Sequence, residues 1–205
     1  MQNFLSDRLP YVSLLRVIAM ILIVIYHSLC FYIDIWWFFP SKKEVLWCYF
    51  AIPIVNVGLS IFVFISGFLF AYLYFEKMKY RNSLSFWVGK IRRLIIPYIF
   101  WGGVMVFLMP TALQLINMFT GVAHLWFLMV LFELFVIAYI YLIVDSLIDK
   151  GKKNYMQFLY DMITFCLSFI IIYVWKNYST HLSFMCITNT LYYLPFFMGG
   201  FFPVL

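Results

Sequence analysis

The sequence predicts an all-α membrane protein, a polytopic bundle of about six transmembrane helices whose N-terminus lies in the cytoplasm. Hydrophobic residues make up 66% of the 205 residues and charged residues only 11%, whereas a soluble domain carries roughly 25% charged residues. Long apolar runs follow one another along the chain, and basic residues gather at alternate ends of these runs. The composition excludes a soluble protein, and residues 1–205 are expected to form a single transmembrane domain.

Six apolar runs reach or approach the length of about 20 helical residues that a bilayer core requires. They are expected at 10–33, 50–75, 94–118, 125–144, about 158–175 and about 183 to the end. Pro10 suits the first turn of the first helix, and Pro97 lies near the predicted start of the third. The first run is too long for the core of a cleavable signal peptide, so it is expected to remain as a helix.

The distribution of basic residues predicts the orientation. If the N-terminus lies inside, the inner side holds ten Lys and Arg residues and the outer loops hold three. The inner set is Arg8, Lys77, Lys79, Arg81, Lys90, Arg92, Arg93, Lys150, Lys152 and Lys153, and the outer set is Lys42, Lys43 and Lys176. This asymmetry follows the positive-inside rule. The net charge of +6 is therefore attributed to topology and to contact with membrane lipids, and no nucleic-acid partner is expected.

Two ionisable side chains, Arg16 and His27, lie within the first apolar run, where each costs at least a few kcal/mol. They are eleven positions apart, which at about 100° per residue returns to nearly the same helix face after about 16 Å of rise. A guanidinium suits a phosphate-bearing ligand, and an imidazole suits proton transfer or nucleophilic attack. The alternatives are an Arg16 that extends to the inner interface and a His27 that hydrogen-bonds within the bundle.

Four segments stand in order along the chain: RVIAMILIVIYH, FVFISGFLFAY, KIRRLIIPYIFW and AHLWFLMVLFELF. Together they resemble motifs of the membrane-bound acyltransferase family 3, the family of O-antigen and capsule acetylases. The motifs are R-x10-H, SGF/L, a basic run before a proline, and HLWFL. The basic run departs from the family's R-x-x-R because Lys90 stands first, and lysine lacks the two-pronged phosphate grip of arginine. The family has more helices than this chain, so the resemblance implies an N-terminal part that is incomplete at its C-terminus.

The resemblance implies transfer of an acyl group, most simply acetyl, from acyl-CoA as co-substrate to a hydroxyl of a cell-surface polysaccharide or its lipid-linked precursor. His27 would be the catalytic group, either as a general base or as a transient covalent carrier of the acyl group. Arg16, Lys90, Arg92 and Arg93 would bind the phosphates of the donor. No bound cofactor is expected. No metal site is expected either, because the four cysteines form no CxxC pair.

Five further polar, small or aromatic residues are candidates for the acyl path and the acceptor side. Ser66 and Gly67 either let two helices approach closely or leave a passage for the acyl chain. His124 and Trp126 lie where the fourth run begins, and Trp126 is either an interfacial aromatic residue or a surface for a sugar ring. Glu133 lies about two turns further along. It either pairs with the cation or the imidazole of the first run, or is protonated and structural.

Two other functions fit the same features. A helix bundle with buried polar residues also suits a non-enzymatic glycan exporter or flippase, and an inactive fragment of an acyltransferase would retain the same motifs. Loss of acetyl esters from the polysaccharide on deletion of the gene would favour the enzyme, whereas polymer retained inside the cell would favour the exporter. In each case the expected location is the cytoplasmic membrane, crossed several times.

Overall fold

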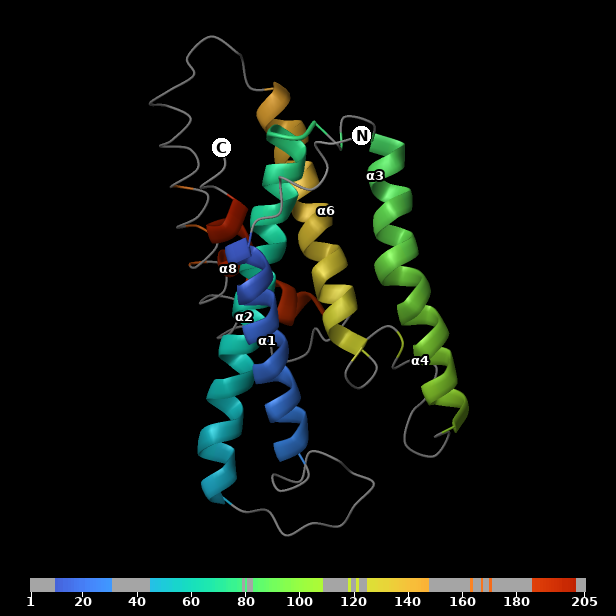
Figure 1. The fold of residues 1–205 in the computed structure, drawn as a ribbon. Helices are drawn as coiled ribbons and strands as arrows, with labels where there is room; N and C mark the ends of the chain where they lie inside the picture. The colour runs from blue at the N-terminus through green and yellow to red at the C-terminus, as the bar shows by residue number, and fades with distance from the viewer. Residues whose placement is uncertain are drawn as a thin grey trace.

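The all-α prediction is confirmed by a computed structural model of the chain. It describes residues 10–30, 45–78, 80, 83–108, 118, 121, 125–147, 163, 167, 170 and 186–201. Every regular element among these residues is a helix (Figure 1). Within this part of the chain, four helical stretches are long and apolar enough to cross a membrane: Pro10–Leu29, Tyr49–Phe75, Ser83–Leu108 and Trp126–Ile143. The fifth predicted span falls outside the described residues, apart from three single positions.

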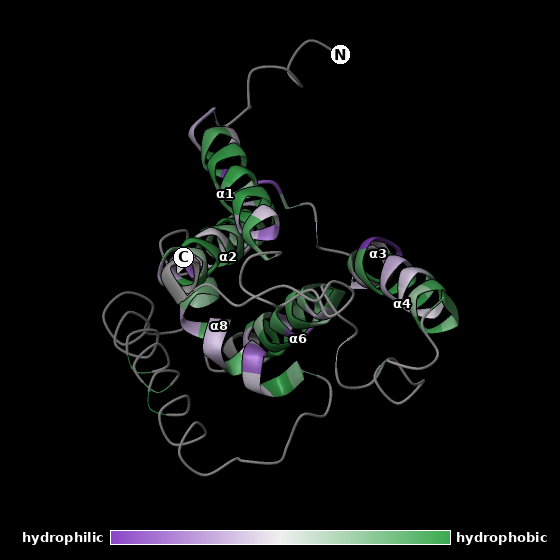
Figure 2. Cartoon of the chain, turned by 90° about the horizontal axis from the view of Figure 1, so that it is seen from below, coloured by the Kyte–Doolittle hydropathy of each residue, from purple (hydrophilic) through white to green (hydrophobic). Residues whose placement is uncertain are grey.

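Helices α1 (Pro10–Leu29) and α2 (Val45–Phe75) lie side by side (Figures 1 and 2). Their close approach depends on Gly58 of α2, because a Cβ atom added there would lie 3.1 Å from the Cβ atom of Leu22 in α1. Ala19 is fully buried, while most other residues of α1 are exposed and apolar. That exposure is expected of a helix whose outer side faces lipid.

The third span begins eleven residues earlier than predicted, at Ser83 instead of 94. It consists of α3 (Ser83–Lys90), a five-residue π-turn η1 (Ile91–Ile95) and α4 (Ile96–Leu108). The prediction assumed that the basic residues precede the helix and that Pro97 opens it. Instead, the Ile96 N–H donates to the Ile91 carbonyl, five residues back. Because of this wider turn, the helix continues through the basic segment and past Pro97. Proline has no N–H and cannot donate the hydrogen bond that an α-helix requires at this position.

Successive spans run in opposite directions. In Figure 1 the beginning of α1, the end of α2, the beginning of α3 and the end of α6 (Trp126–Leu147) all lie toward the upper end. The described basic residues just after α2 and in the first half of the third span (Lys77, Lys90, Arg92 and Arg93) therefore lie toward the same end of the bundle, as the predicted topology requires. The bounds of α6 agree with the fourth predicted span.

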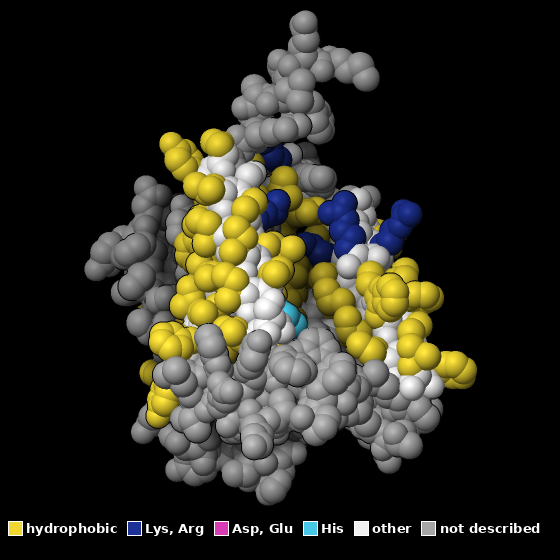
Figure 3. Space-filling view, turned by 60° about the horizontal axis from the view of Figure 1, so that its bottom comes forward, with side chains coloured by type: hydrophobic (Ala, Val, Ile, Leu, Met, Phe, Trp, Pro, Cys, Tyr) yellow, Lys and Arg dark blue, Asp and Glu magenta, His cyan; other side chains and the backbone are white. Residues whose placement is uncertain are grey.

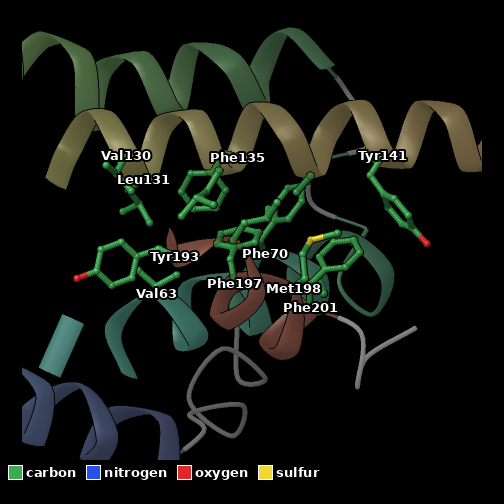
Figure 4. Packing of buried hydrophobic residues seen from close by; sticks show 14 of the residues in the cluster. Val63, Phe70, Val130, Leu131, Phe135, Tyr141, Tyr193, Phe197, Met198 and Phe201 are labelled. Carbon is green, nitrogen blue, oxygen red and sulfur yellow. The ribbon is translucent and has the colours of Figure 1, made fainter. Parts of the chain in front are cut away.

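Helix α8 (Ile187–Phe201) lies between α2 and α6 (Figures 1 and 2). Its described part has 15 residues, fewer than the roughly 20 that a bilayer core requires, and the sequence predicted a span from about 183 to the end, which includes residues outside the described ranges. More than half of its residues are buried. Figure 4 shows its aromatic side chains packed between α6 and α2, with Phe197 and Phe201 beside Phe70 and Phe135. The short helix thus fills the centre of the bundle.

Two glycines set the spacing between α2 and α8. A Cβ atom on Gly67 of α2 would overlap the carbonyl oxygen of Phe197 in α8. In return, a Cβ atom on Gly200 of α8 would overlap the carbonyl oxygen of Phe64 in α2. The two backbones therefore touch at a reciprocal glycine contact, an arrangement typical of closely packed membrane helices.

Candidate functional site

Arg16 and His27 lie in one unbroken helix, α1. Their spacing in a regular helix puts both side chains on one side, with about 16 Å of rise between them. Arg16 is exposed and His27 is half-buried. Arg16 also begins a shallow groove of about 450 Å³ along α1. The described residues that line it are Arg16, Val17, Met20, Ile21, Val24 and Ile25. Arg16 therefore lies on the exposed surface of α1, while the imidazole is partly enclosed.

A hydrogen bond within α1 fixes the tautomer of His27. Its Nδ1 atom lies 2.7 Å from the carbonyl oxygen of Ile23, one turn earlier. A carbonyl oxygen only accepts, so Nδ1 must carry the proton and donate it. In the neutral ring this assignment places the lone pair on Nε2. The Tyr26 ring also meets the imidazole edge-on, with 5.4 Å between the ring centroids. His27 is thus held in the form that accepts a proton or attacks a carbonyl through Nε2.

The three basic residues of the third span lie in different surroundings. Arg92 and Arg93 lie in the π-turn and are exposed. Lys90 is half-buried, and its Nζ atom lies 3.2 Å from the centroid of the Phe135 ring in α6. The structure therefore separates the lysine of the K-x-x-R motif from the arginines that follow it.

Lys and Arg side chains gather around a hollow between the α1–α2 side and the α3–α4 side of the molecule (Figure 3). The described basic residues at this end of the bundle come from α1, the end of α2 and the beginning of the third span: Arg16, Lys77, Lys90, Arg92 and Arg93. Burial raises the pKa of Tyr80, and the Arg93 guanidinium nearby opposes that rise. The arrangement provides positive charge from three parts of the chain for an anionic ligand.

The small residues of α2 are accounted for by packing. Ser66 Oγ donates to the carbonyl oxygen of Phe62 at 2.8 Å, within the same helix. The backbone of Phe197 occupies the space beside Gly67. Of the two alternatives that the sequence left open, close helix approach explains Gly67, and the position offers no room for an acyl chain.

Glu133 has a partner that the sequence reasoning missed. Thr190 Oγ1 in α8 donates to Glu133 Oε2 at 2.6 Å, and Thr190 is only 2% exposed. Among the described residues, the other carboxyl oxygen, Oε1, is buried without a hydrogen-bond partner. The signal in the sequence was Thr190 itself, a polar residue within an apolar run, but its partner 57 residues away becomes evident only when α6 and α8 are packed together.

Replacing Thr190 by Val should destabilise the protein by about 1–3 kcal/mol, because the Glu133 carboxyl group loses its only described hydrogen bond in a buried place. Thermal unfolding in detergent measures the effect. Thr190→Ser retains the donor and is the matched control, with a Tm expected close to that of the unchanged protein. Equal Tm values for the Val and Ser variants would show that the hydrogen bond contributes nothing.

The acceptor-side candidates are only partly described. His124 lies outside the described residues. Trp126 is half-buried at the start of α6 and stacks on Tyr193 of α8, with ring centroids 6.2 Å apart and an interplanar angle of 26°. One face of the indole is thus covered by protein. The roles of His124 and Trp126 toward an acceptor stay predictions.

Comparison with known proteins agrees with the motifs. A family model described as an acyltransferase domain, the acyltransferase 3 model, matches residues 9–202. A search of curated proteins and a search of solved structures each find no match. The family match covers nearly the whole chain, from before α1 to the end of α8, and confirms the resemblance. The chain therefore belongs to the acyltransferase 3 family, and it is a membrane protein whose general chemistry is acyl transfer.

Proposed function

We propose that the protein is an O-acyltransferase of the cytoplasmic membrane. It transfers an acyl group, acetyl in the simplest case, from acyl-CoA to a hydroxyl of a cell-surface polysaccharide or its lipid-linked precursor. The proposal rests on an exposed Arg16 and a half-buried His27 in one regular helix, α1, where their spacing of eleven residues puts them on one side. Membership of the acyltransferase 3 family supports acyl transfer in general.

The donor binds through its phosphates at the basic end of the bundle. Arg16 on α1 and the exposed Arg92 and Arg93 of the π-turn supply guanidinium groups, which bind phosphate with paired, charge-assisted hydrogen bonds. With the N-terminus in the cytoplasm, this end faces the compartment that contains acyl-CoA. The thioester then extends along α1 toward His27.

His27 carries the chemistry through Nε2. As a general base, it takes the proton of the acceptor hydroxyl while the oxygen attacks the thioester carbonyl. The new C–O bond forms, the C–S bond breaks, and the proton passes to the departing thiolate to give free CoA. As a covalent carrier, Nε2 itself attacks the thioester carbonyl, the C–S bond breaks and the CoA thiolate leaves. The acceptor hydroxyl then attacks the same carbonyl, the C–N bond breaks and frees Nε2, and the hydroxyl proton passes to the thiolate to give free CoA. Both routes use the tautomer that the hydrogen bond to Ile23 favours.

Replacing Arg16 by Gln should raise the KM for acetyl-CoA about 10- to 100-fold, because one or two hydrogen bonds to a charged phosphate are lost. The kcat should change less, because the guanidinium lies about 16 Å of helix rise from the imidazole. Arg16→Lys keeps the charge without the paired hydrogen bonds, so its KM should lie between that of the unchanged protein and that of Arg16→Gln. Titration of labelled acetyl-CoA against membranes with polysaccharide gives both constants, and an unchanged KM in Arg16→Gln would remove Arg16 from the donor site.

The reaction itself is tested by the ester content of the cell's polysaccharide. Cells with the intact gene should carry acyl esters that are absent when the gene is deleted and return when it is restored. Unchanged ester content would contradict acyl transfer to this acceptor. If the polymer were also retained inside the deleted cells, the result would favour the glycan exporter.

A further inference from the structure

The ammonium group of Lys90 lies inside a cage of four aromatic rings. Its Nζ atom lies 3.2 Å from the centroid of Phe135, 5.5 Å from Phe86, 5.8 Å from Tyr80 and 5.9 Å from Phe70. Aromatic faces attract a cation through their negative π-electron density, most strongly where water is excluded. The Nζ atom of Lys90 is therefore surrounded by aromatic rings on several sides.

The four rings come from four different parts of the chain and pack on one another. Phe70 belongs to α2, Phe86 to α3 and Phe135 to α6, and Tyr80 lies between α2 and α3. Phe70 is 5.3 Å from Phe86, 6.0 Å from Tyr80 and 5.6 Å from Phe135 between ring centroids. The three phenylalanines are at most 5% exposed. Movement of Lys90 would therefore require several buried side chains to move.

Lys90 is also the junction between α3 and the π-turn that carries Arg92 and Arg93. A π-turn replaces the i→i−4 hydrogen bonds of the α-helix by i→i−5 bonds, so the residues within it are turned relative to a regular α-helix. At this turn the cage anchors the first end, and the Ile96 N–H to Ile91 carbonyl hydrogen bond closes the other. The two arginines between these anchors are exposed.

We propose that Lys90 is a positioning residue: its caged ammonium fixes the rotation of the π-turn so that Arg92 and Arg93 face the donor phosphates. This inference rests on the proposed donor site and changes the role predicted for Lys90 itself. The ammonium of Lys90 already lies against the rings of α2, α3 and α6. The arginines bind the donor, and the lysine holds them in place.

Kinetics with labelled acetyl-CoA test the inference through the KM. Lys90→Met keeps the length of the side chain and removes the charge, and it should raise the KM about tenfold with little change in kcat. Lys90→Arg restores a cation for the cage and should stay close to the unchanged protein. Gly89→Ala is the neighbouring control, because an added Cβ atom there would point into open space, and its KM should not change.

A double-mutant cycle separates positioning from direct phosphate contact. If the cage acts through Lys90, Phe135→Leu should also raise the KM, and the Lys90→Met/Phe135→Leu double variant should be no worse than Lys90→Met alone. If Lys90 binds phosphate itself, Phe135→Leu should leave the KM unchanged. That result, or an unchanged KM in Lys90→Met, would overturn the inference while acyl transfer by the unchanged protein would still support the proposed function.

A second measurement does not depend on activity. A cysteine placed by Arg93→Cys should react with a membrane-impermeant maleimide in inside-out vesicles, above the background of the chain's own cysteines. Adding Lys90→Met should slow this labelling severalfold, because the π-turn is no longer held with position 93 on the exposed side. Equal labelling rates with and without Lys90→Met would overturn the positioning role, even if acetyl-CoA proved not to be the donor.

Discussion

Replacement of His27 by Gln is expected to lower kcat for acyl transfer by about 100- to 10,000-fold, the range that a general base contributes. Gln retains an N–H that can donate to the Ile23 carbonyl, as Nδ1 of His27 does. It lacks a basic nitrogen, so it can neither take the hydroxyl proton nor carry an acyl group. The measurement is the transfer of label from acetyl-CoA to the polysaccharide by membranes that contain equal amounts of each variant.

Ser28→Ala is the matched control for the His27 variant. Ser28 is exposed, and its hydroxyl donates to the Val24 carbonyl at 3.0 Å within α1. Its loss should leave kcat and KM within about twofold of the unchanged protein, as is usual for surface substitutions. A His27→Gln protein that transfers label as fast as Ser28→Ala would remove the imidazole from the mechanism.

Gly67→Ala is expected to have the largest effect on stability. It should lower the free energy of unfolding by about 3 kcal/mol or more, the upper end of what overpacking usually costs. The added methyl group would overlap the Phe197 carbonyl oxygen, which belongs to backbone and cannot move as a flexible side chain can. Helices α2 and α8 would have to separate. Thermal unfolding in detergent, or the yield of folded protein where the variant does not assemble, measures this loss.

Two other glycines make the stability test specific. Gly200→Ala places its methyl group on the opposite side of the same crossing, against the Phe64 carbonyl oxygen, and should be as damaging as Gly67→Ala. Gly103→Ala, in α4, has open space around the added atom, and alanine is the better helix former, so its Tm should stay the same or rise slightly. If Gly67→Ala and Gly103→Ala unfolded at the same temperature, the close contact between α2 and α8 would be wrong.

The positions of three spans could be predicted because the length of an apolar run is a local property of the sequence. The runs that became α1, α2 and α6 each contain 20 or more residues, most of them apolar, which is the length that a bilayer core requires. The start of the third span was wrong because Lys90 and the two arginines after it were taken as a flank of the membrane segment. In the structure aromatic rings shield the Lys90 charge and a π-turn passes Pro97, and both features depend on partners that the local sequence does not identify.

In the candidate site, too, some features could be predicted from the local sequence and others could not. The shared side of Arg16 and His27 follows from helix periodicity alone, and α1 has the regular helix that this reasoning requires. The environments of Lys90, Gly67 and Glu133 could not be derived, because each is set by a helix distant in sequence. For Glu133 the decisive atom is the hydroxyl of Thr190, which comes near only because the short helix α8 lies between α2 and α6.

The mechanism requires Arg16 and His27 to lie on the same side of α1. The most direct test is to move the imidazole by one residue. In the double variant His27→Ser/Ser28→His, the ring stays at almost the same depth, about 1.5 Å further along, but turns about 100° around the helix. Transfer of label from acetyl-CoA to polysaccharide should fall to the level of His27→Gln. Transfer at the rate of the unchanged protein would contradict a mechanism in which Arg16 and His27 must share one side of α1.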